Sequence, residues 1–438
     1  MQRFFHFQRP ALLIATLLLL LWAEGAVLEL RRRFYPSKLS VTEIKAPNKQ
    51  AIPNNSKSKI NLLAAKTDSL LPLESFYKAL VRLERDKNGL IRIGYWGDSM
   101  IEGDIITGEL RSLLQNRFGG FGVGFIPITA VSAQYRPTIS HSFSNNWIVV
   151  NWNSSNCKEH PPGIGGFSFS PQTNSWVTLT SKTILPKDSS LRVKLYYQTL
   201  NPKSRLWKDD IEIKIPFNSF LSAFEFSSLT STPTSTPASI KLKFEADSLF
   251  TVYGLSVESK KGVLVDNYSF RGSTGLQLAS ISNSQMKAFQ KQLNYQLIII
   301  HFGVNIAQVG STNFDWYENS MVLTINRLKE QMPNTSFLII GIGDKGYKKQ
   351  GQYYSDSSVV SIEAAQKRIA QRTNSAFWSQ LKAMGGSSSI KSWAEDSVPK
   401  LAAPDYIHLS YSGGKKIAQS LYDYLQDGFH HYINQLKP

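Results

Sequence analysis

The chain has 438 residues, enough for two domains after any targeting segment, and its 42% apolar content fits a globular protein with a sizeable core. Its net charge of +17 favours an anionic partner such as nucleic acid, anionic lipid or an acidic glycan, the alternative being a solvated basic surface. No nucleic-acid-binding signature is present, so a nucleic acid is not expected. The single cysteine, Cys157, excludes an intramolecular disulfide, and no Cys/His spacing predicts a metal or cofactor site.

Residues 1–35 form the first predicted element. A short basic start, "MQRFFHFQRP", is followed by an apolar run that only Glu24 interrupts, and then by arginines at 31–33. This pattern predicts a signal peptide or a single membrane anchor. We favour a retained anchor, with the rest of the chain outside the cytoplasm, in the cell envelope or periplasm. Secretion after cleavage is the alternative.

A polar linker is predicted over 36–72, followed by the first part of an α/β domain over 73–133. This part is expected to hold a helix at 73–85, a buried strand at 90–96 and a helix at 105–118, because apolar residues recur at the matching periods.

The character of the chain changes over 134–261. Ser, Thr, Asn and aromatic residues become dense, strand patterns alternate, and helix patterns are nearly absent. We predict an all-β insert, a sandwich. Its tryptophans could stack on sugar rings, but sandwich cores also use tryptophan, and we favour a structural role for Trp147, Trp152, Trp176 and Trp207.

Alternation of strands and helices returns over 262–438. The patterns predict buried strands at 296–302 and 336–342, and helices near 315–332, 359–373 and 412–427. Such alternation predicts an α/β domain whose parallel sheet has helices on both faces. The two α/β parts are therefore expected to form one domain that the β insert interrupts.

Ser99 is the main candidate for chemistry. It follows the strand at 90–96, and ligands of open parallel sheets bind at the carboxyl ends of the strands. A serine nucleophile needs a histidine base and a group that orients the base. His408, three residues after Asp405 in the loop before the last helix, fits that need, the alternative being a surface histidine in a capping loop. His301 lies within a buried strand and is expected to be a core residue.

An oxyanion would need hydrogen-bond donors near Ser99. Asn305 follows the strand at 296–302 and could donate from its amide, although asparagine is also a common turn former. Gly272 could offer a backbone N–H that approaches closely. A competing motif, "GIGDKG" at 341–346, follows a strand, but no helix pattern comes next, so a dinucleotide site is not expected.

Four sequence blocks carry these residues: "GDS" at 97–99, "NYSFRGST" at 267–274, "GVN" at 303–305 and "DYIH" at 405–408. They occur in the order found in the SGNH/GDSL hydrolase superfamily, and the sequence resembles it. The resemblance implies a flavodoxin-like three-layer α/β/α fold and no cofactor. Met100 stands where the GDSL pattern has leucine, a position that packs rather than reacts. The roles implied are nucleophile for Ser99, base for His408, orienting acid for Asp405, and an oxyanion hole from Ser99, Gly272 and Asn305.

A closer resemblance covers most of 90–425. The stretches after Ser99 and before His408 look like those of peptidoglycan O-acetylesterases and their transferase relatives, which also carry a carbohydrate-binding-like insert after the first block. The resemblance implies an esterase that removes acetyl groups from an envelope glycan or another polysaccharide. The alternatives are an O-acetyltransferase supplied by a membrane acyl-donor protein, and a glycan-binding protein without catalysis.

Overall fold

The computed structural model describes residues 72–182, 190–201, 203–230, 239–245 and 249–436. All of them belong to one compact unit. The predicted targeting segment 1–35 and nearly all of the linker lie outside the described residues, so both stay predictions. Within the described ranges, no helix combines the length and apolar character needed to cross a membrane.

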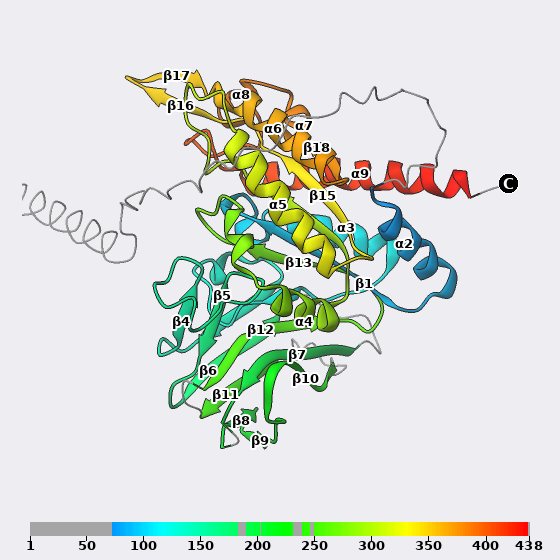
Figure 1. Cartoon of the computed structure of the whole chain (residues 1–438), viewed down its shortest axis with the longest axis vertical. Coiled ribbons are helices and arrows are strands. Elements are labelled where there is room, and N and C mark those ends of the chain that lie inside the picture. Colours follow the sequence, from blue (N-terminus) through cyan, green and yellow to red (C-terminus); the bar gives the residue numbers. More distant parts are fainter. Residues whose placement is uncertain (1–71, 183–189, 202, 231–238, 246–248, 437–438) are drawn as a thin grey trace, which may run out of the picture. The chain divides into compact units, whose positions relative to one another are not determined.

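A parallel sheet of five strands forms the centre of the α/β part (Figure 1). Numbered by their place along the chain among these five, the strands lie in the order 2-1-3-4-5, which is the order of flavodoxin-like sheets. β1 pairs with β13 on one side and β14 on the other, always in parallel. The strands in sheet order are β13 (Gly262–Ser269), β1 (Leu90–Gly97), β14 (Tyr295–His301), β15 (Ser336–Gly341) and β18 (Ala376–Ser379).

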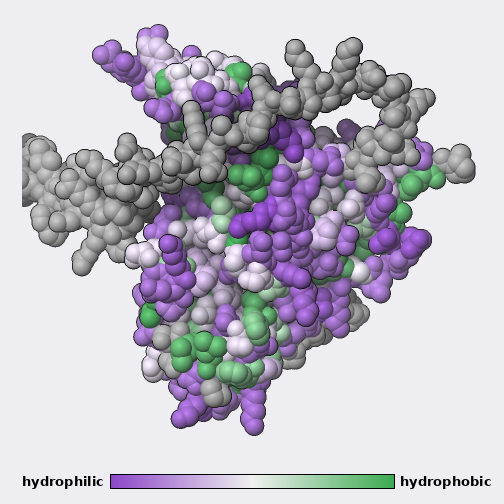
Figure 2. All heavy atoms as spheres, viewed as in Figure 1, coloured by the Kyte–Doolittle hydropathy of each residue, from purple (hydrophilic) through white to green (hydrophobic). Residues whose placement is uncertain are grey.

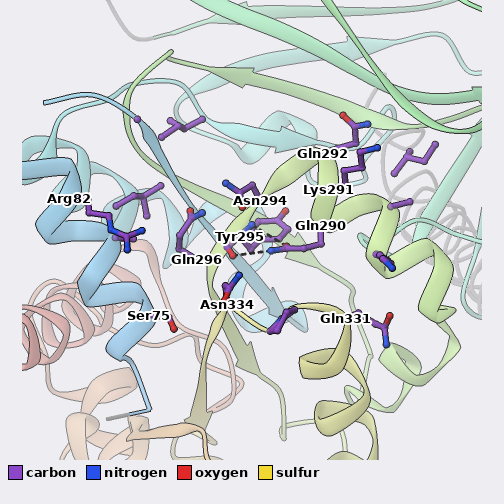
Figure 3. Close-up of a pocket in the computed structure, with 18 of the residues that line it drawn as sticks. Ser75, Arg82, Gln290, Lys291, Gln292, Asn294, Tyr295, Gln296, Gln331 and Asn334 are labelled. Carbon is purple, nitrogen blue, oxygen red and sulfur yellow. Dashed lines mark hydrogen bonds between the residues drawn. The ribbon is translucent and has the colours of Figure 1, made fainter. Parts of the chain in front are cut away.

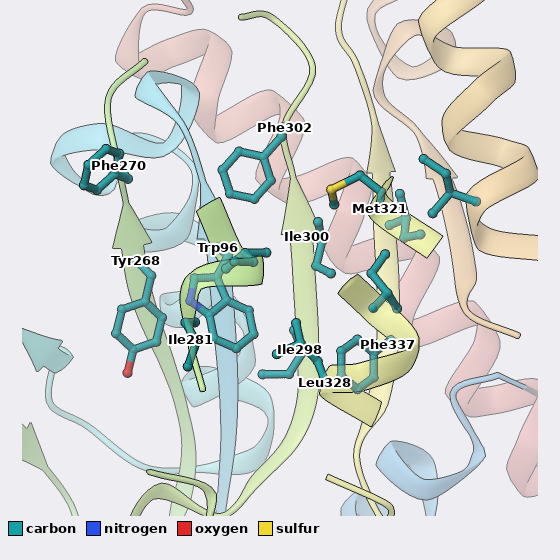
Figure 4. Close-up of a cluster of buried hydrophobic side chains, with 14 of the residues drawn as sticks. Trp96, Tyr268, Phe270, Ile281, Ile298, Ile300, Phe302, Met321, Leu328 and Phe337 are labelled. Atoms are coloured by element: carbon teal, nitrogen blue, oxygen red, sulfur yellow. The ribbon is translucent and has the colours of Figure 1, made fainter. Parts of the chain in front are cut away.

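Helices cover both faces of this sheet because its strands are apolar on both sides. In β14, Ile298 and Ile300 join one buried cluster, whereas Leu297 and Ile299 join another. Figure 4 shows the first cluster, with Trp96 against Ile298 and Ile300. The predicted three-layer α/β/α arrangement is confirmed. Its helices are α4 (Asn283–Leu293), α5 (Asp315–Gln331) and α6 (Ser358–Arg372) on the first face, and α2 (Glu74–Asp86), α3 (Thr107–Phe118), α7 (Gln380–Met384), α8 (Ser389–Glu395) and α9 (Tyr411–Gln435) on the second.

Two antiparallel sheets form the insert, as predicted, and enclose a separate apolar cluster. Trp147 and Trp152 are buried, which confirms a structural role for these two, while Trp176 and Trp207 are half-buried. One sheet holds β10 (Asn218–Thr230), β7 (Ser190–Thr199), β12 (Phe250–Glu258), β5 (Phe167–Ser170), β4 (Ile148–Asn151) and β2 (Gly124–Ile126). The other holds β3 (Ile139–Phe143), β6 (Ser175–Ser181), β11 (Ser239–Glu245), β8 (Arg205–Lys208) and β9 (Ile211–Ile213).

The insert and the parallel sheet meet around a buried arginine. Arg92 of β1, only 2% exposed, donates to Asp266 of β13 and to Glu258 of β12, each at 2.8 Å. Burial alone would raise the pKa of Glu258, but the charges of Arg92 and Lys194 outweigh it and lower that pKa to about 2. A fully paired ionic group of this kind fixes three strands from both parts of the chain to one another. The boundaries predicted at 134 and 261 stay predictions.

Two further interpretations of the sequence are confirmed. His301 is 2% exposed in β14, and the Tyr95 hydroxyl lies 3.1 Å from its Nδ1. After the glycine motif at 341–346 the chain forms a hairpin of β16 (Gly346–Lys349) and β17 (Gln352–Ser355) instead of the helix that a dinucleotide site would need.

Candidate active site

Ser99 lies at the carboxyl edge of the parallel sheet, where β1 turns into a short 3₁₀ segment, Ser99–Asp104. The turn requires glycine at 97, because a Cβ there would lie 2.9 Å from Ile101 and 3.0 Å from the His301 carbonyl. Asp98 caps the segment by accepting from the Met100 N–H at 2.9 Å. Ser99 is half-buried and lies two residues after the end of β1.

His408 and Asp405 lie in line with this hydroxyl. The Oγ of Ser99 is 2.9 Å from His408 Nε2, and Nδ1 of the same ring is 2.7 Å from Asp405 Oδ2. The other carboxylate oxygen accepts the backbone N–H groups of Ile407 and His408, both at 3.0 Å. Burial raises the pKa of Asp405, but these hydrogen bonds outweigh it and hold that pKa below its ordinary value. A charged Asp405 keeps the Nδ1 proton, which leaves Nε2 free to accept from Ser99.

Two glycines explain why segments 309 residues apart meet here. A Cβ at Gly413 would lie 1.8 Å from the Leu401 carbonyl oxygen, and one at Gly414 would lie 2.0 Å from that of Ile105. Only glycine lets the first turn of α9 pack so closely against the backbone just after the Ser99 segment. Ser410 caps this turn by accepting from the Gly413 N–H at 3.1 Å. The loop that carries His408 is thereby held against Ser99.

The two predicted oxyanion donors lie on neighbouring loops, and their roles stay predictions. Gly272 is exposed and has a φ of 76°, a conformation that favours glycine. Asn305 is also exposed, and its side-chain nitrogen donates to Asp98 at 3.1 Å and to the Ser273 carbonyl at 2.9 Å. These two bonds use both hydrogens of the amide. A substrate oxyanion that Asn305 binds would therefore replace one of these acceptors.

Asp98 is a site residue to which the sequence analysis gave no role. It is 1% exposed, and burial raises its pKa to about 7, although hydrogen bonds from Met100 and Asn305 and the charge of His408 act against that rise. The residue therefore titrates near neutral pH directly beside Ser99. Its position after a buried strand was visible in the sequence, but its contact with Asn305 joins residues 207 apart.

Exposed polar and aromatic side chains lie beside the 3₁₀ segment that begins at Ser99. Arg271, next to Gly272, donates to Glu102 of the Ser99 segment, and its Nε lies 3.0 Å from Glu102 Oε2. Tyr135 and Tyr411 are 60% and 47% exposed, both lie against Gly103, and the Tyr411 hydroxyl donates to the Tyr135 carbonyl. No motif in the sequence marks these side chains as part of a site. Among the described residues, no cluster of three or more His, Cys, Asp or Glu side chains could hold a metal ion.

Comparison with known proteins identifies the fold. No protein-family model and no curated protein matches the sequence. The structure of a peptidoglycan O-acetylesterase is similar, with a TM-score of 0.68 and 22% identity over 82% of this chain and 96% of that chain. The family two carbohydrate esterase of Cellvibrio japonicus has a TM-score of 0.27 and 9% identity, covering 68% of this chain and 99% of that chain. Axe2, an acetylxylan esterase of Geobacillus stearothermophilus, has a TM-score of 0.27 and 19% identity, covering 37% and 71%.

The chain thus has an SGNH/GDSL hydrolase-like fold with a β-rich insert, which confirms the fold that the sequence resemblance implies. The peptidoglycan O-acetylesterase structure supports this fold, because the match covers 82% of this chain and 96% of that chain.

Proposed function

We propose that this protein is an SGNH-type serine esterase that removes acetyl groups from a glycan of the cell envelope. The observation that supports it best is the continuous chain of hydrogen-bonding distances from Ser99 through His408 to Asp405, 2.9 and 2.7 Å long. Nucleophile, base and orienting acid need that order and that reach. Acetylated peptidoglycan is the first substrate to test, because a peptidoglycan O-acetylesterase has a similar structure.

The reaction follows from these positions. The Ser99 oxygen attacks the acetyl carbonyl carbon while its proton moves to His408 Nε2, and Asp405 stabilises the imidazolium that forms. Backbone N–H groups of Ser99 and Gly272, with the Asn305 amide, would hold the oxyanion. His408 then returns the proton to the sugar oxygen as the ester bond breaks. Water, activated by the same histidine, releases acetate from Ser99.

The surroundings of Ser99 suit a sugar ester more than a lipid. Tyr135 and Tyr411 offer exposed aromatic surface, and Arg271 and Glu102 offer polar groups beside the Gly272 loop. A sugar ring has apolar faces for the first and hydroxyls for the second. We therefore place the glycan over the Ser99 segment with its acetyl group directed at Ser99.

Acyl-chain length tests the substrate class. We expect kcat/KM to fall from p-nitrophenyl acetate through butyrate to octanoate, because exposed and polar side chains beside the Ser99 segment should gain little from a longer acyl chain. Each methylene buried in a fitted tunnel would instead contribute about 0.8 kcal/mol. Ser99→Ala supplies the blank, and Ser239→Ala, which changes an exposed serine of the insert, supplies the matched control. A steady rise with chain length would identify a lipid-directed esterase.

The direction of acyl transfer is tested with the polymer. We propose hydrolysis outside the cytoplasm by a protein retained at the membrane through residues 1–35. Full-length protein in detergent should release acetate from O-acetylated peptidoglycan in step with the loss of ester. Acetyl that passes to an added sugar acceptor without release of acetate would instead identify the transferase.

A further inference from the structure

A large groove lies at the end of the parallel sheet opposite Ser99 (Figure 3). Its volume is about 1490 Å³, and its lining includes Leu90 at the start of β1 and Tyr295 at the start of β14. Pockets for small molecules occupy roughly 300–1,000 Å³, so this groove has room for a segment of a polymer. β1 has eight residues, which places the groove about 25 Å from the catalytic serine.

The charges in the groove have one sign. Lys78, Arg82, Lys287 and Lys291 line it, and its lining contains no Asp or Glu. Lys78 pairs with Glu74 at 2.6 Å, but no carboxylate of the described residues forms an ion pair with the other three, which are all exposed. Lys291 lies in the last turn of α4, where any helix favours a cation. Arg82 and Lys287 lie before the last turns of their helices, so the helix dipole does not account for a cation at these positions.

The uncharged lining is made of hydrogen-bonding groups. Eight asparagine and glutamine residues contribute to it, together with three serines. Figure 3 shows Arg82, Gln296 and Asn334 directed toward the space between α2, α4 and the start of β14. Phe220 of β10, 77% exposed, also lines the groove. Hydrophilic residues predominate on the face of the molecule that carries α4 and α5 (Figure 2). The amides can bind sugar hydroxyls, the cations can bind carboxylates, and the exposed ring of Phe220 can stack on a sugar. The lining therefore matches an acidic sugar polymer.

We infer that this groove binds a glycan that carries carboxylates, and that it holds the polymer whose esters reach Ser99. The inference rests on the proposed function for the link to the active site, although the groove itself does not. A nucleic acid fits less well, because one arginine and one exposed aromatic residue, Phe220, are few for phosphates and bases. An anionic bilayer fits less well, because the cations line a hollow and not a projecting surface. The predicted linker 36–72 is itself basic and would be repelled.

Binding of an oligogalacturonate of about ten sugars to the full-length protein, measured by calorimetry, tests this inference. We expect the triple variant Arg82→Gln/Lys287→Gln/Lys291→Gln to bind about 3- to 100-fold more weakly, because each exposed ion pair contributes little alone. Affinity should also fall as salt is added. The matched control is Lys158→Gln/Lys241→Gln/Lys367→Gln, which removes the same charge at exposed positions outside the groove and should bind as the wild type does.

The remaining measurements separate this inference from the proposed function. The groove variant should hydrolyse p-nitrophenyl acetate at the wild-type rate, since its changes lie at the other end of the sheet. Normal esterase activity without binding of the oligogalacturonate, or with equal binding by both triple variants, would overturn the groove assignment alone. Tighter binding of single-stranded DNA or phosphatidylglycerol vesicles that the groove variant loses would also overturn it. A wild type that binds the acidic glycan but cleaves no ester would refute the esterase and leave the groove in place.

Discussion

The two ends of the parallel sheet use opposite kinds of construction. At the carboxyl end, His408 is held within 3 Å of both Ser99 and Asp405 by short loops and by glycines that admit close backbone contact. At the amino end, charged and amide side chains from several helices and strands surround a wide groove. Chemistry needs fixed atoms, whereas retention of a polymer needs many weak contacts. The effects of substitutions at the two ends should differ accordingly.

Loss of the base or the nucleophile should have the largest effect. His408→Ala should lower kcat for p-nitrophenyl acetate about 10⁴-fold or more, as Ser99→Ala should, because the members of a triad act as a unit. Asp405→Asn should retain more activity, since Asp405 orients the ring and moves no proton. Affinity for oligogalacturonate should not change in these variants. Near-wild-type turnover in Ser99→Ala would rule out the serine mechanism.

Arg92→Met should have the next largest effect, which is a loss of stability. It leaves Asp266 buried without its cation and leaves Glu258 paired only with Lys194 and Arg192, which should cost about 3–5 kcal/mol of unfolding free energy. Because the network joins the insert to β1, binding in the groove beside β10 should suffer more than ester turnover per folded molecule. Chemical denaturation and calorimetry measure both. An unchanged denaturation midpoint would show that the network stabilises nothing.

Asn305→Ala should lower kcat roughly 10²- to 10³-fold, the cost of one oxyanion donor. The fold should survive, since the side chain is exposed. This variant separates two roles, because Asn305 donates to Asp98 and Ser273 in the present structure. An unchanged kcat with a higher KM would mean that Asn305 binds substrate and does not stabilise the oxyanion.

The smallest predicted effect is a dependence of stability on pH. The pKa of Asp98 is raised by burial to about 7 in the folded chain, against 3.8 as its ordinary value. The folded state therefore binds the proton more tightly, and the stabilisation that results is complete below pH 3.8 and is lost as pH rises through about 7. Asp98→Asn should remove this slope, on the order of a few kcal/mol at most. Parallel curves for the two proteins between pH 4 and 8 would contradict the assignment.

The elements and residues that the sequence predicted have strong local signals. The apolar runs that became β1, β14 and β15 are flanked by turn residues, and Ser99, Asn305 and His408 each follow a recognisable motif. β18 was missed because four residues, Ala376–Ser379, show too little periodicity. The contact of Asp98 with Asn305 and the groove were missed because they join residues distant in sequence. No sequence pattern near Lys287 indicates that Arg82 lines the same groove.

The short connection between β12 and β13 determines whether the insert can be removed from the α/β part. Only three residues separate Glu258, the last of β12, from Gly262, the first of β13. Tyr196 and Tyr253 of the insert share one apolar cluster with Tyr268 and Phe289 of the α/β part. Excision of the insert would therefore expose an aromatic layer and the buried pair of Arg92 with Asp266. The modules inferred from sequence are topological units but not thermodynamic ones, and heat should melt them in a single cooperative transition.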